Sequence, residues 1–496
     1  MSLDGKGPLW DQVCRALRVE IRDGRLNPGA RLPSSRTLAR SLGLSRNTTL
    51  PAYRQLHAEG YLTSKTGSGT FVATDLPATL KPNDKSRSTQ RTRGDGPRSL
   101  SNWGTSVVAE LRTSPLIAVR DRAPVRYDFL YGVPGPALFP VEVWSRAVAR
   151  RARAASARTL GYGPPEGNLE LRTELTSYLA KARGVECSPE QIVIVHGAQQ
   201  ALQLLCRVLV NRGDPVLIED PHYISARHVL NVEGAELVPI PVDDDGACLD
   251  TVPPKVLRRA KLAYVTPSHQ FPTGAVMSFP RRKELLSWAD SAGATLVEDD
   301  YDSEFRYEGR PIESLHSLDK NGRVVYVGTF SKTLFPSLRV GYIVAPPSLI
   351  PALVGAKWLA DWGNSTLGQQ VLADLLRDGS FERHLRRTCV RYGDLRKTLC
   401  RAVEEHFGNR AIVAGANAGL HVLLRLDGLN ATELDRLVQN ARNVSVGVYS
   451  LAPYYLRKPK RVGLILGYTL LNERDIREGI RLLAQTTPCM VMRGRP

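Results

Sequence analysis

The chain has 496 residues, 42% of them hydrophobic and 23% charged, and its formal net charge at pH 7 is +18. This length predicts about two to four globular domains, and no apolar stretch approaches the roughly 20 residues that cross a bilayer. The start, MSLDGKGPLW, lacks the basic and apolar regions of a secretory signal, so we expect the chain to stay in the cytoplasm. The seven cysteines are scattered without C-x-x-C spacing, which argues against a disulfide framework or a zinc site, while the positive charge favours a polyanionic partner.

The first predicted elements lie between residues 9 and 72, where helical periodicity alternates with short loops. The opening segment, LWDQVCRALRVEIRDGRL, predicts an amphipathic helix. Ser34 and Ser35 can cap a second helix that begins near Arg36, Gly43 marks its end, and Ser45 can cap a third helix. Two helices joined by a short glycine turn form the helix-turn-helix pattern, whose second helix enters the major groove of DNA.

The segment that follows, YLTSKTGSGTFV, predicts two short strands about a Gly-Ser-Gly turn, which is a wing. Residues 1–72 carry 11 Lys and Arg against 5 Asp and Glu, so this region has a charge of +6. Pro51 falls inside the predicted third helix, where it removes one backbone hydrogen bond at a typical cost of about 3 kcal/mol. We expect either a kink at Pro51 or weakened DNA binding.

Residues 73–121 lose this periodicity. They contain TDLPATLKPNDKSRSTQRTRGDGPRSL, which is rich in Pro, Ser, Thr, Arg and Asp and has too little apolar content to form a core. We interpret this region as a linker, and its later part, VVAELRTSPLIAV, predicts a short helix that docks on the region after it.

From about residue 122 onward, short apolar runs alternate with helical segments. The runs are QIVIV, PVLIE, AELVPIPV, LAYVT, ATLVE and VVYVG. Continuous apolar strands separated by helices indicate a mostly parallel sheet covered on both faces, so the fold class is α/β. In such sheets ligands bind outside the carboxyl ends of the strands, which makes the residues after each run the informative ones.

Polar side chains and a helix-opening glycine turn follow several of these runs. Taken singly, each has an ordinary structural interpretation, such as a solvated loop lysine or a helix cap. Together they suit a phosphorylated aldehyde, because Lys332 can form a Schiff base with a carbonyl and Asp299 can pair with a pyridinium nitrogen. That is the chemistry of pyridoxal 5'-phosphate. The residues gathered at this edge are Ala198, Gln199, Tyr223, Asp299, Tyr301, Thr329, Ser331, Lys332 and Arg339.

Three motifs, TPSHQFPTG, VEDDYDSEF and TFSKTLFPSLRVGY, resemble the cofactor-binding motifs of fold-type I aminotransferases, and specifically of the MocR subfamily of GntR-type bacterial transcription regulators. The resemblance implies a pyridoxal phosphate site in which Lys332 forms the Schiff base (the internal aldimine), Asp299 pairs with the ring nitrogen and Tyr223 stacks on the ring. It also implies that Tyr301 lies near the phenolic oxygen. A homodimer is implied because Tyr162 matches the tyrosine that reaches the phosphate bound by the partner subunit. The implied phosphate ligands are Thr329, Ser331 and Arg339.

Two departures from the aminotransferase pattern bear on activity. Phe271 stands where those enzymes commonly carry an asparagine that bonds the ring oxygen, so His269 or Gln270 is expected to take its place. Ile465 stands at about the position of the arginine that grips the substrate carboxylate in the enzymes, and an apolar residue cannot do this. The candidates to replace it are Arg227, Arg457 and Arg461.

The order LPSSRTLARSLGLSRNT, then GYL, then GSGTFV resembles the GntR winged helix. The alternative interpretation of this region is a helical dimerisation or docking module. The resemblance implies that the helix after Ser45 contacts DNA and that the Gly67–Gly69 turn belongs to the wing. The residues that it places at DNA are Arg36, Ser45, Arg46, Asn47, Thr48, Lys65, Gly67 and Gly69.

The sequence thus predicts an N-terminal winged helix-turn-helix domain (1–72), a linker (73–121) and a fold-type I aminotransferase-like domain (122–496) that binds pyridoxal 5'-phosphate. Our first hypothesis is a transcription regulator that binds double-stranded DNA and senses an amine, an amino acid or pyridoxal phosphate itself. The alternative is a working aminotransferase with an accessory winged helix. The missing arginine favours the regulator, in which sustained transamination is not expected.

Overall fold

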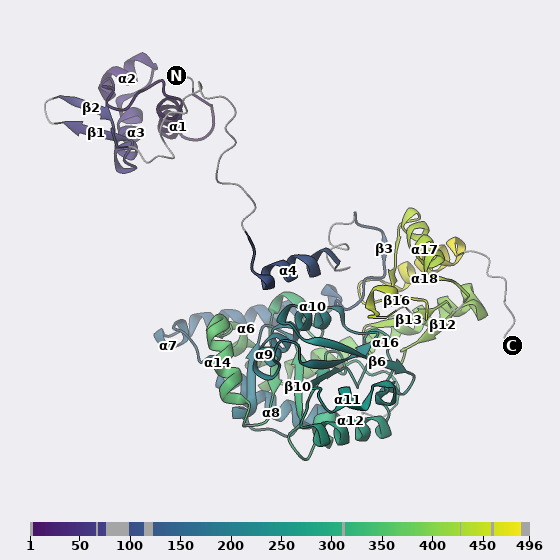
Figure 1. Ribbon diagram of the computed structural model, residues 1–496. Coiled ribbons are helices and arrows are strands. Elements are labelled where there is room, and N and C mark those ends of the chain that lie inside the picture. The colour runs from purple at the N-terminus through teal and green to yellow at the C-terminus, as the bar shows by residue number, and fades with distance from the viewer. Residues whose placement is uncertain are drawn as a thin grey trace. The chain divides into compact units, whose positions relative to one another are not determined.

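The computed structural model of the chain describes residues 3–65, 68–75, 99–113, 123–309, 313–426, 428–457 and 461–487. Its contacts divide the chain into two compact units, Met1–Ser99 and Leu100–Pro496 (Figure 1). Gly67 and most of the predicted linker lie outside the described residues. Among the helices of the described ranges, none combines the length and the apolar composition that crossing a bilayer requires.

The first unit consists of helices and an antiparallel hairpin. Its elements are α1 (Leu9–Arg22), α2 (Ser35–Ser41), α3 (Arg46–Ala58), β1 (Leu62–Lys65) and β2 (Gly69–Val72). The apolar stripe of α1 packs against α3, and Val13, Ile21 and Leu56 are fully buried in this contact. Helix, turn, helix and hairpin therefore follow in the predicted order.

The helix boundaries of the first unit follow the predicted caps with one exception. Ser34 Oγ accepts a hydrogen bond from the backbone N–H of Thr37 at 3.1 Å, which caps α2. Ser45 occupies the N-cap position of α3, but its side chain makes no cap hydrogen bond, because its hydroxyl lies 3.0 Å from the Thr48 hydroxyl instead. α3 runs through Pro51 without ending there.

The second unit is organised around an eight-stranded sheet in the order β4-β11-β10-β9-β8-β5-β6-β7. Five adjacent strands of this sheet run parallel to one another: β6, β5, β8, β9 and β10. The strand β11 pairs antiparallel with both β10 and β4. The strand β11 was not among the predicted runs. The bounds are β4 (Ile192–Val195), β5 (Pro215–Asp220), β6 (Glu236–Asp243), β7 (Gly246–Ala247), β8 (Leu262–Val265), β9 (Thr295–Asp300), β10 (Val324–Thr329) and β11 (Gly341–Val344).

Helices cover both faces of this sheet, as the continuous apolar strands predict. One face packs against α9, α10 and α14, and the other against α8, α12 and α15 (Figure 1). The helices before and around the sheet are α4 (Asn102–Thr113), α6 (Val141–Arg153), α7 (Ala157–Leu160), α8 (Leu169–Arg183), α9 (Ala198–Leu209), α10 (Ile224–Glu233), α11 (Pro254–Leu257), α12 (Phe279–Ala292), α13 (Leu315–Leu318), α14 (Ile350–Asp361) and α15 (Thr366–Arg377).

The carboxyl-terminal part of the second unit carries a smaller antiparallel sheet in the order β12-β13-β16-β15. Its apolar side packs in one core with the three helices of this part, α16, α17 and α18. The elements are β12 (Ile412–Ala414), β13 (His421–Arg425), β15 (Tyr449–Ser450), β16 (Gly463–Gly467), α16 (Ser380–Phe407), α17 (Ala431–Asn443) and α18 (Glu473–Thr486), with a short parallel pair of β3 (Tyr127–Asp128) and β14 (Val446–Gly447).

The short helix predicted at the end of the linker, over 107–119, corresponds in part to α4, which begins earlier, at Asn102, and ends at Thr113; residues 114–119 of the predicted segment lie outside the described residues. α4 packs on α10, where Asn231 Nδ2 donates to Glu110 Oε1 at 3.1 Å and His228 Nε2 lies 3.4 Å from Glu110 Oε2. α4 therefore belongs to the second unit.

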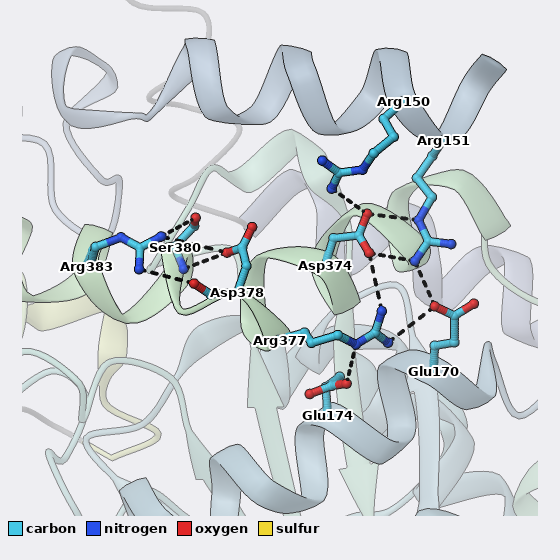
Figure 2. Close-up of polar contacts among 9 residues, drawn as sticks. All are labelled: Arg150, Arg151, Glu170, Glu174, Asp374, Arg377, Asp378, Ser380 and Arg383. Carbon is cyan, nitrogen blue, oxygen red and sulfur yellow. Dashed lines mark hydrogen bonds and ion pairs between the residues drawn. The ribbon is translucent and has the colours of Figure 1, made fainter. Parts of the chain in front are cut away.

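An ion-pair network fixes α6 against α8 and α15 (Figure 2). The nearly buried carboxylate of Asp374 accepts hydrogen bonds from Arg150 at 2.8 Å and from Arg151 at 2.6 and 2.9 Å. Arg151 also donates to Glu170 at 2.7 Å, and Arg377 lies 3.3 Å from the same carboxylate. The network holds the end of α6. From there the chain continues into α7 and then into α8, which precedes the first strand of the large sheet, β4.

Candidate functional site

A cavity of about 470 Å³ opens at the carboxyl ends of the parallel strands, where the sequence predicted a ligand site. The predicted residues that line it are Ala198, Gln199, Tyr223, Asp299, Tyr301, Thr329, Ser331, Lys332 and Arg339. Register explains the convergence, because Asp299 pairs with Val327 and Glu298 with Val265 on neighbouring parallel strands.

Lys332 follows the end of β10 and extends into the cavity. Its Nζ donates a hydrogen bond to the carbonyl of Gly132 at 2.6 Å, and burial lowers the pKa of the amine. Asp302 and Asp299 oppose that shift but do not cancel it. A lysine in this state gives up its proton more easily than a solvated one and becomes a better nucleophile.

Asp299 presents an unusual hydrogen-bonding deficit. The hydroxyl of Tyr264 donates to its Oδ2 at 2.6 Å, but no residue in the described part of the chain bonds its buried Oδ1. Burial raises the pKa of this carboxyl to about 7. An unpaired buried acceptor is costly, so this atom fits a ligand that brings an N–H group, such as a protonated ring nitrogen.

Backbone and side-chain donors form an anion cradle beside the amine. Gly197, with φ of +89°, opens the twelve-residue helix α9, whose first N–H groups point toward the cavity. The positive φ of Gly197 favours glycine at this turn, and the Arg339 guanidinium lies in ordinary contact distance of it. Arg339 itself has φ of +53° and donates to the carbonyl of His196. The hydroxyls of Thr329 and Ser331 complete the cradle.

Tyr301 is held by a buried histidine and carboxylate. Its hydroxyl donates to the carbonyl of His269 at 2.9 Å, and His269 Nδ1 lies 3.1 Å from both oxygens of Asp302. Burial lowers the pKa of His269, but the Asp302 carboxylate raises it, and the pKa is raised overall. His421, which also lines the cavity, has its pKa lowered to about 3 by burial and is neutral.

His269 therefore does not line the cavity itself but contacts three residues that do, Tyr301, Asp302 and His421, and Gln270 does not line it either. The Gln270 amide donates to the carbonyls of Pro221 at 2.8 Å and Phe271 at 2.6 Å, which commits it to the structure of its own loop. Neither of the two residues predicted to replace the missing asparagine lines the cavity, although each contacts a residue that does.

The arginines predicted to bind a carboxylate lie elsewhere. Arg461 pairs with the exposed Asp244 at 3.2 Å, Arg227 lies 3.3 Å from His228, and neither they nor Arg457 line the cavity. Ile465 is fully buried in β16 among apolar residues. Among the described lining residues, the cationic side chains are those of Lys332 and Arg339.

Tyr162 is not in the cavity of its own chain. Its side chain is 87% exposed, and its ring centroid lies 5.1 Å from that of Trp362. The residues predicted at DNA lie in the first unit, where Arg36, Ser45, Arg46, Asn47, Lys65 and Gly69 are exposed and Thr48 is half-buried.

Several cavity residues escaped the sequence analysis. Tyr264 lies inside an apolar strand, and Gly132 comes from a segment far from Lys332 in the chain, so neither carried a local signal. Asp302 was inside a quoted motif without an assigned role. The other such lining residues are Leu130, Tyr131, Val133, Thr266, Phe271, Pro336, Leu420 and His421.

Comparison with known proteins gives two family matches. The family "Bacterial regulatory proteins, gntR family" matches residues 9–72, and "Aminotransferase class I and II" matches residues 133–462. The probable rhizopine catabolism regulatory protein MocR of Rhizobium meliloti is 38% identical over 97% of this chain and 94% of its own length. The pyridoxine biosynthesis transcriptional regulator PdxR of Corynebacterium glutamicum is 30% identical over 94% of this chain and 93% of its own length.

Solved structures match the second unit. The kynurenine aminotransferase of Pyrococcus horikoshii superposes with a TM-score of 0.72 at 30% identity, covering 79% of this chain and 98% of that one. The α-aminoadipate aminotransferase LysN of Thermus thermophilus, complexed with N-(5'-phosphopyridoxyl)-L-leucine, gives a TM-score of 0.69 at 30% identity over 78% of this chain and 98% of that one.

A winged helix-turn-helix followed by an aminotransferase fold defines a class of DNA-binding transcription regulators rather than a free-standing enzyme. The chain belongs to the GntR family of bacterial regulators, in its MocR-type branch with an aminotransferase class I and II domain. The predicted fold class, the predicted resemblance and the prediction of a DNA-binding regulator are confirmed.

The raised pKa of Asp299 generates a prediction for the cofactor-free protein. The folded state keeps this proton up to a pH of about 7, whereas an unfolded aspartate loses it near pH ~3.9. The resulting stability is fully present below the unfolded pKa and is lost as the pH rises through about 7. Asp299→Asn removes this titration, so wild-type Tm should fall relative to the variant between about pH 4 and pH 7 and level off above that range.

Thermal unfolding of both proteins across that pH range measures the effect. Asp244→Asn is the control, because the Asp244 side chain is 88% exposed and its substitution should leave the pH dependence as in the wild type. Parallel Tm curves for wild type and Asp299→Asn would show that the carboxyl is not the titrating group.

Proposed function

We propose that the second unit binds pyridoxal 5'-phosphate at Lys332 and that a primary amine, an amino acid or the cofactor itself acts there as the effector that controls DNA binding by the first unit. The observation that carries this proposal is the buried, unpartnered Oδ1 of Asp299 in the same cavity as the Lys332 amine and an anion cradle. Pyridoxal phosphate presents a ring nitrogen, an aldehyde and a phosphate, one for each of these three features.

The donor set fits the cofactor residue by residue. Asp299 would hold the proton on the ring nitrogen, and Tyr223 would lie against the ring. Thr329, Ser331 and Arg339 would bind the phosphate together with the first N–H groups of α9. When bound, the cofactor supplies an aldehyde that reacts with primary amines.

The chain's own residues favour sensing over turnover. The lowered pKa of Lys332 lets its amine compete with an incoming amine for the same carbonyl. Repeated proton transfer needs the substrate held within about an ångström of its productive position. The described lining residues offer only Arg339 as a guanidinium, and it belongs to the phosphate cradle, which supports a binding role with little or no sustained transamination.

The cofactor proposal predicts a yellow protein whose cofactor becomes covalently fixed to Lys332 on borohydride treatment. Lys332→Ala should abolish this labelling, because the nucleophile is gone, while the exposed-lysine control Lys181→Ala should keep it. Peptide mass spectrometry after incubation with pyridoxal phosphate and reduction locates the label. Absence of labelling in the wild type, or labelling at other lysines alone, would contradict the proposal.

The proposal includes a homodimer. Exposed apolar side chains gather at the end of α14 and in the segment after α7, where the rings of Trp358 and Trp362 lie 5.5 Å apart and Tyr162 packs on Trp362. This patch adjoins the anion cradle, because Asn364 Nδ2 lies 3.1 Å from His196 Nδ1. A second copy covering the patch would bury it and bring Tyr162 of one subunit toward the phosphate site of the other.

Leu359→Lys should therefore give a monomer. Leu359 is 78% exposed, so the substitution leaves the fold intact while placing a charge in the proposed interface. Sedimentation should show dissociation together with weaker binding of pyridoxal phosphate. Val390→Lys is the control, because Val390 is an apolar residue on α16 that is 70% exposed. This variant should sediment and bind pyridoxal phosphate like the wild type. A Leu359→Lys dimer of unchanged stability would exclude this surface.

For DNA, we propose that the helix α3 reads base edges in the major groove with Arg46, Asn47 and Thr48 near its start. Arg46→Ala should weaken binding to the preferred duplex by about 1–3 kcal/mol if Arg46 contacts a base edge. Pro51→Ala restores one backbone N–H within α3 and should bind equally well or better.

Titration of each variant with a duplex selected from a randomised library, and with a scrambled duplex at the same salt concentration, measures both effects. If the wild type bound the two duplexes with equal affinity, sequence-specific recognition by α3 would be refuted, since charge alone gives non-specific binding.

A further inference from the structure

The first unit contains a groove of about 900 Å³ that lies between α3, the segment before α2 and the hairpin. Arg31, Arg54 and His57 line it together with hydroxyl-bearing residues such as Ser34 and Ser64. No carboxylate is present among its described lining residues. A groove with cationic and hydroxyl donors and no acid on its walls fits a polyanion.

The ion pairs of the first unit sort its arginines into two groups. Arg15, Arg18 and Arg25, on or next to α1, are paired with the carboxylates of Asp4, Asp11, Glu59, Glu20 and Asp23. Arg31 and Arg54 are exposed and make no ion pair with any residue in the described part of the chain. Arg22, Arg36, Arg40 and Arg46 are likewise exposed and unpaired within the described residues, but of these unpaired arginines only Arg31 and Arg54 line the groove.

Arg31 is carried on rigid backbone. Leu32 N donates to Thr70 O and Val72 N to Ala30 O, both at 2.9 Å, so the residues around Arg31 extend the hairpin as an extra strand. A Cβ added to Gly69 would lie 3.2 Å from Arg31 Nε, which places the guanidinium over the hairpin turn.

The opposite wall is held to the same segment. Tyr53, next to Arg54 on α3, donates its hydroxyl to the carbonyl of Pro33 at 2.7 Å. The two arginines thus stand on elements that are hydrogen-bonded to each other, and the width of the groove between them is fixed before any ligand binds.

We propose that this groove holds the sugar-phosphate backbone of bound DNA and that Arg31 and Arg54 each contact a phosphate. The inference rests on the DNA-binding role of the first unit and adds residues to it. With α3 in the major groove and the hairpin beside it, the strand that separates the two must cross between them, and guanidinium groups bind phosphate oxygens through two parallel hydrogen bonds. Such contacts position the protein without reading sequence.

Salt dependence tests the proposal. Each phosphate contact contributes about 0.9 to the negative slope of log K against log salt concentration. Arg31→Gln and Arg54→Gln should each reduce the magnitude of that slope by about 0.9, equally for a duplex selected from a randomised library and for a scrambled duplex. The ratio of the two affinities should stay unchanged.

Arg22→Gln is the matched control, because Arg22 is an exposed arginine at the end of α1, outside the groove. It should leave the slope as in the wild type, and Tm values confirm that all variants are folded. An unchanged slope in Arg31→Gln and Arg54→Gln, or a changed ratio between selected and scrambled duplexes, would overturn the proposal. The change of the salt slope can be measured with the scrambled duplex, which needs neither base recognition nor the cofactor. This outcome is therefore separate from a failure of cofactor binding or of base recognition.

Discussion

The structure of the second unit depends on the burial of three consecutive carboxylates at the end of β9. Glu298 accepts hydrogen bonds from two backbone N–H groups of α13 at 2.9 Å, and Asp300 accepts from Arg183 and Tyr326 at 2.6 Å. Asp299, between them, receives only the hydroxyl of Tyr264. The carboxylates of Glu298 and Asp300 have hydrogen-bond partners within the fold, so the remaining acceptor, Oδ1 of Asp299, is available to a ligand. A turn of the strand that moved Asp299 away would also expose Glu298 and Asp300.

The same reasoning applies to cations in the first unit. Several charged groups that their own chain leaves unpartnered together at a concave surface mark a ligand site better than a charge count does. A net charge of +18 is spread over the whole sequence and says little about where a polyanion binds. The groove that Arg31 and Arg54 line without a carboxylate among its described lining residues gives a specific location for it.

Sequence alone predicted those features that follow from local pattern. The apolar runs became strands, and Asp299 and Lys332 lie together because parallel strands end at one edge. The partners of these residues were not predictable in this way. Gly132 reaches Lys332 from 200 positions away, and Tyr264 looked like one more apolar strand residue until the sheet register placed it beside Asp299. Ser45 had the right residue type for a cap, but its hydroxyl bonds another side chain.

Contacts within the second unit connect the cavity to the chain segment that leads toward the first unit. Tyr223 lines the cavity and immediately precedes α10, and α10 carries the Asn231 and His228 contacts with Glu110 of α4. Contiguity is a physical requirement for many coupling routes and does not by itself demonstrate one. Coupling is defined by linkage: if an effector at Lys332 changes the affinity for DNA by some factor, DNA must change the affinity for that effector by the same factor. If the proposed effector controls DNA binding, it must therefore bind the regulator with a different affinity when DNA is bound.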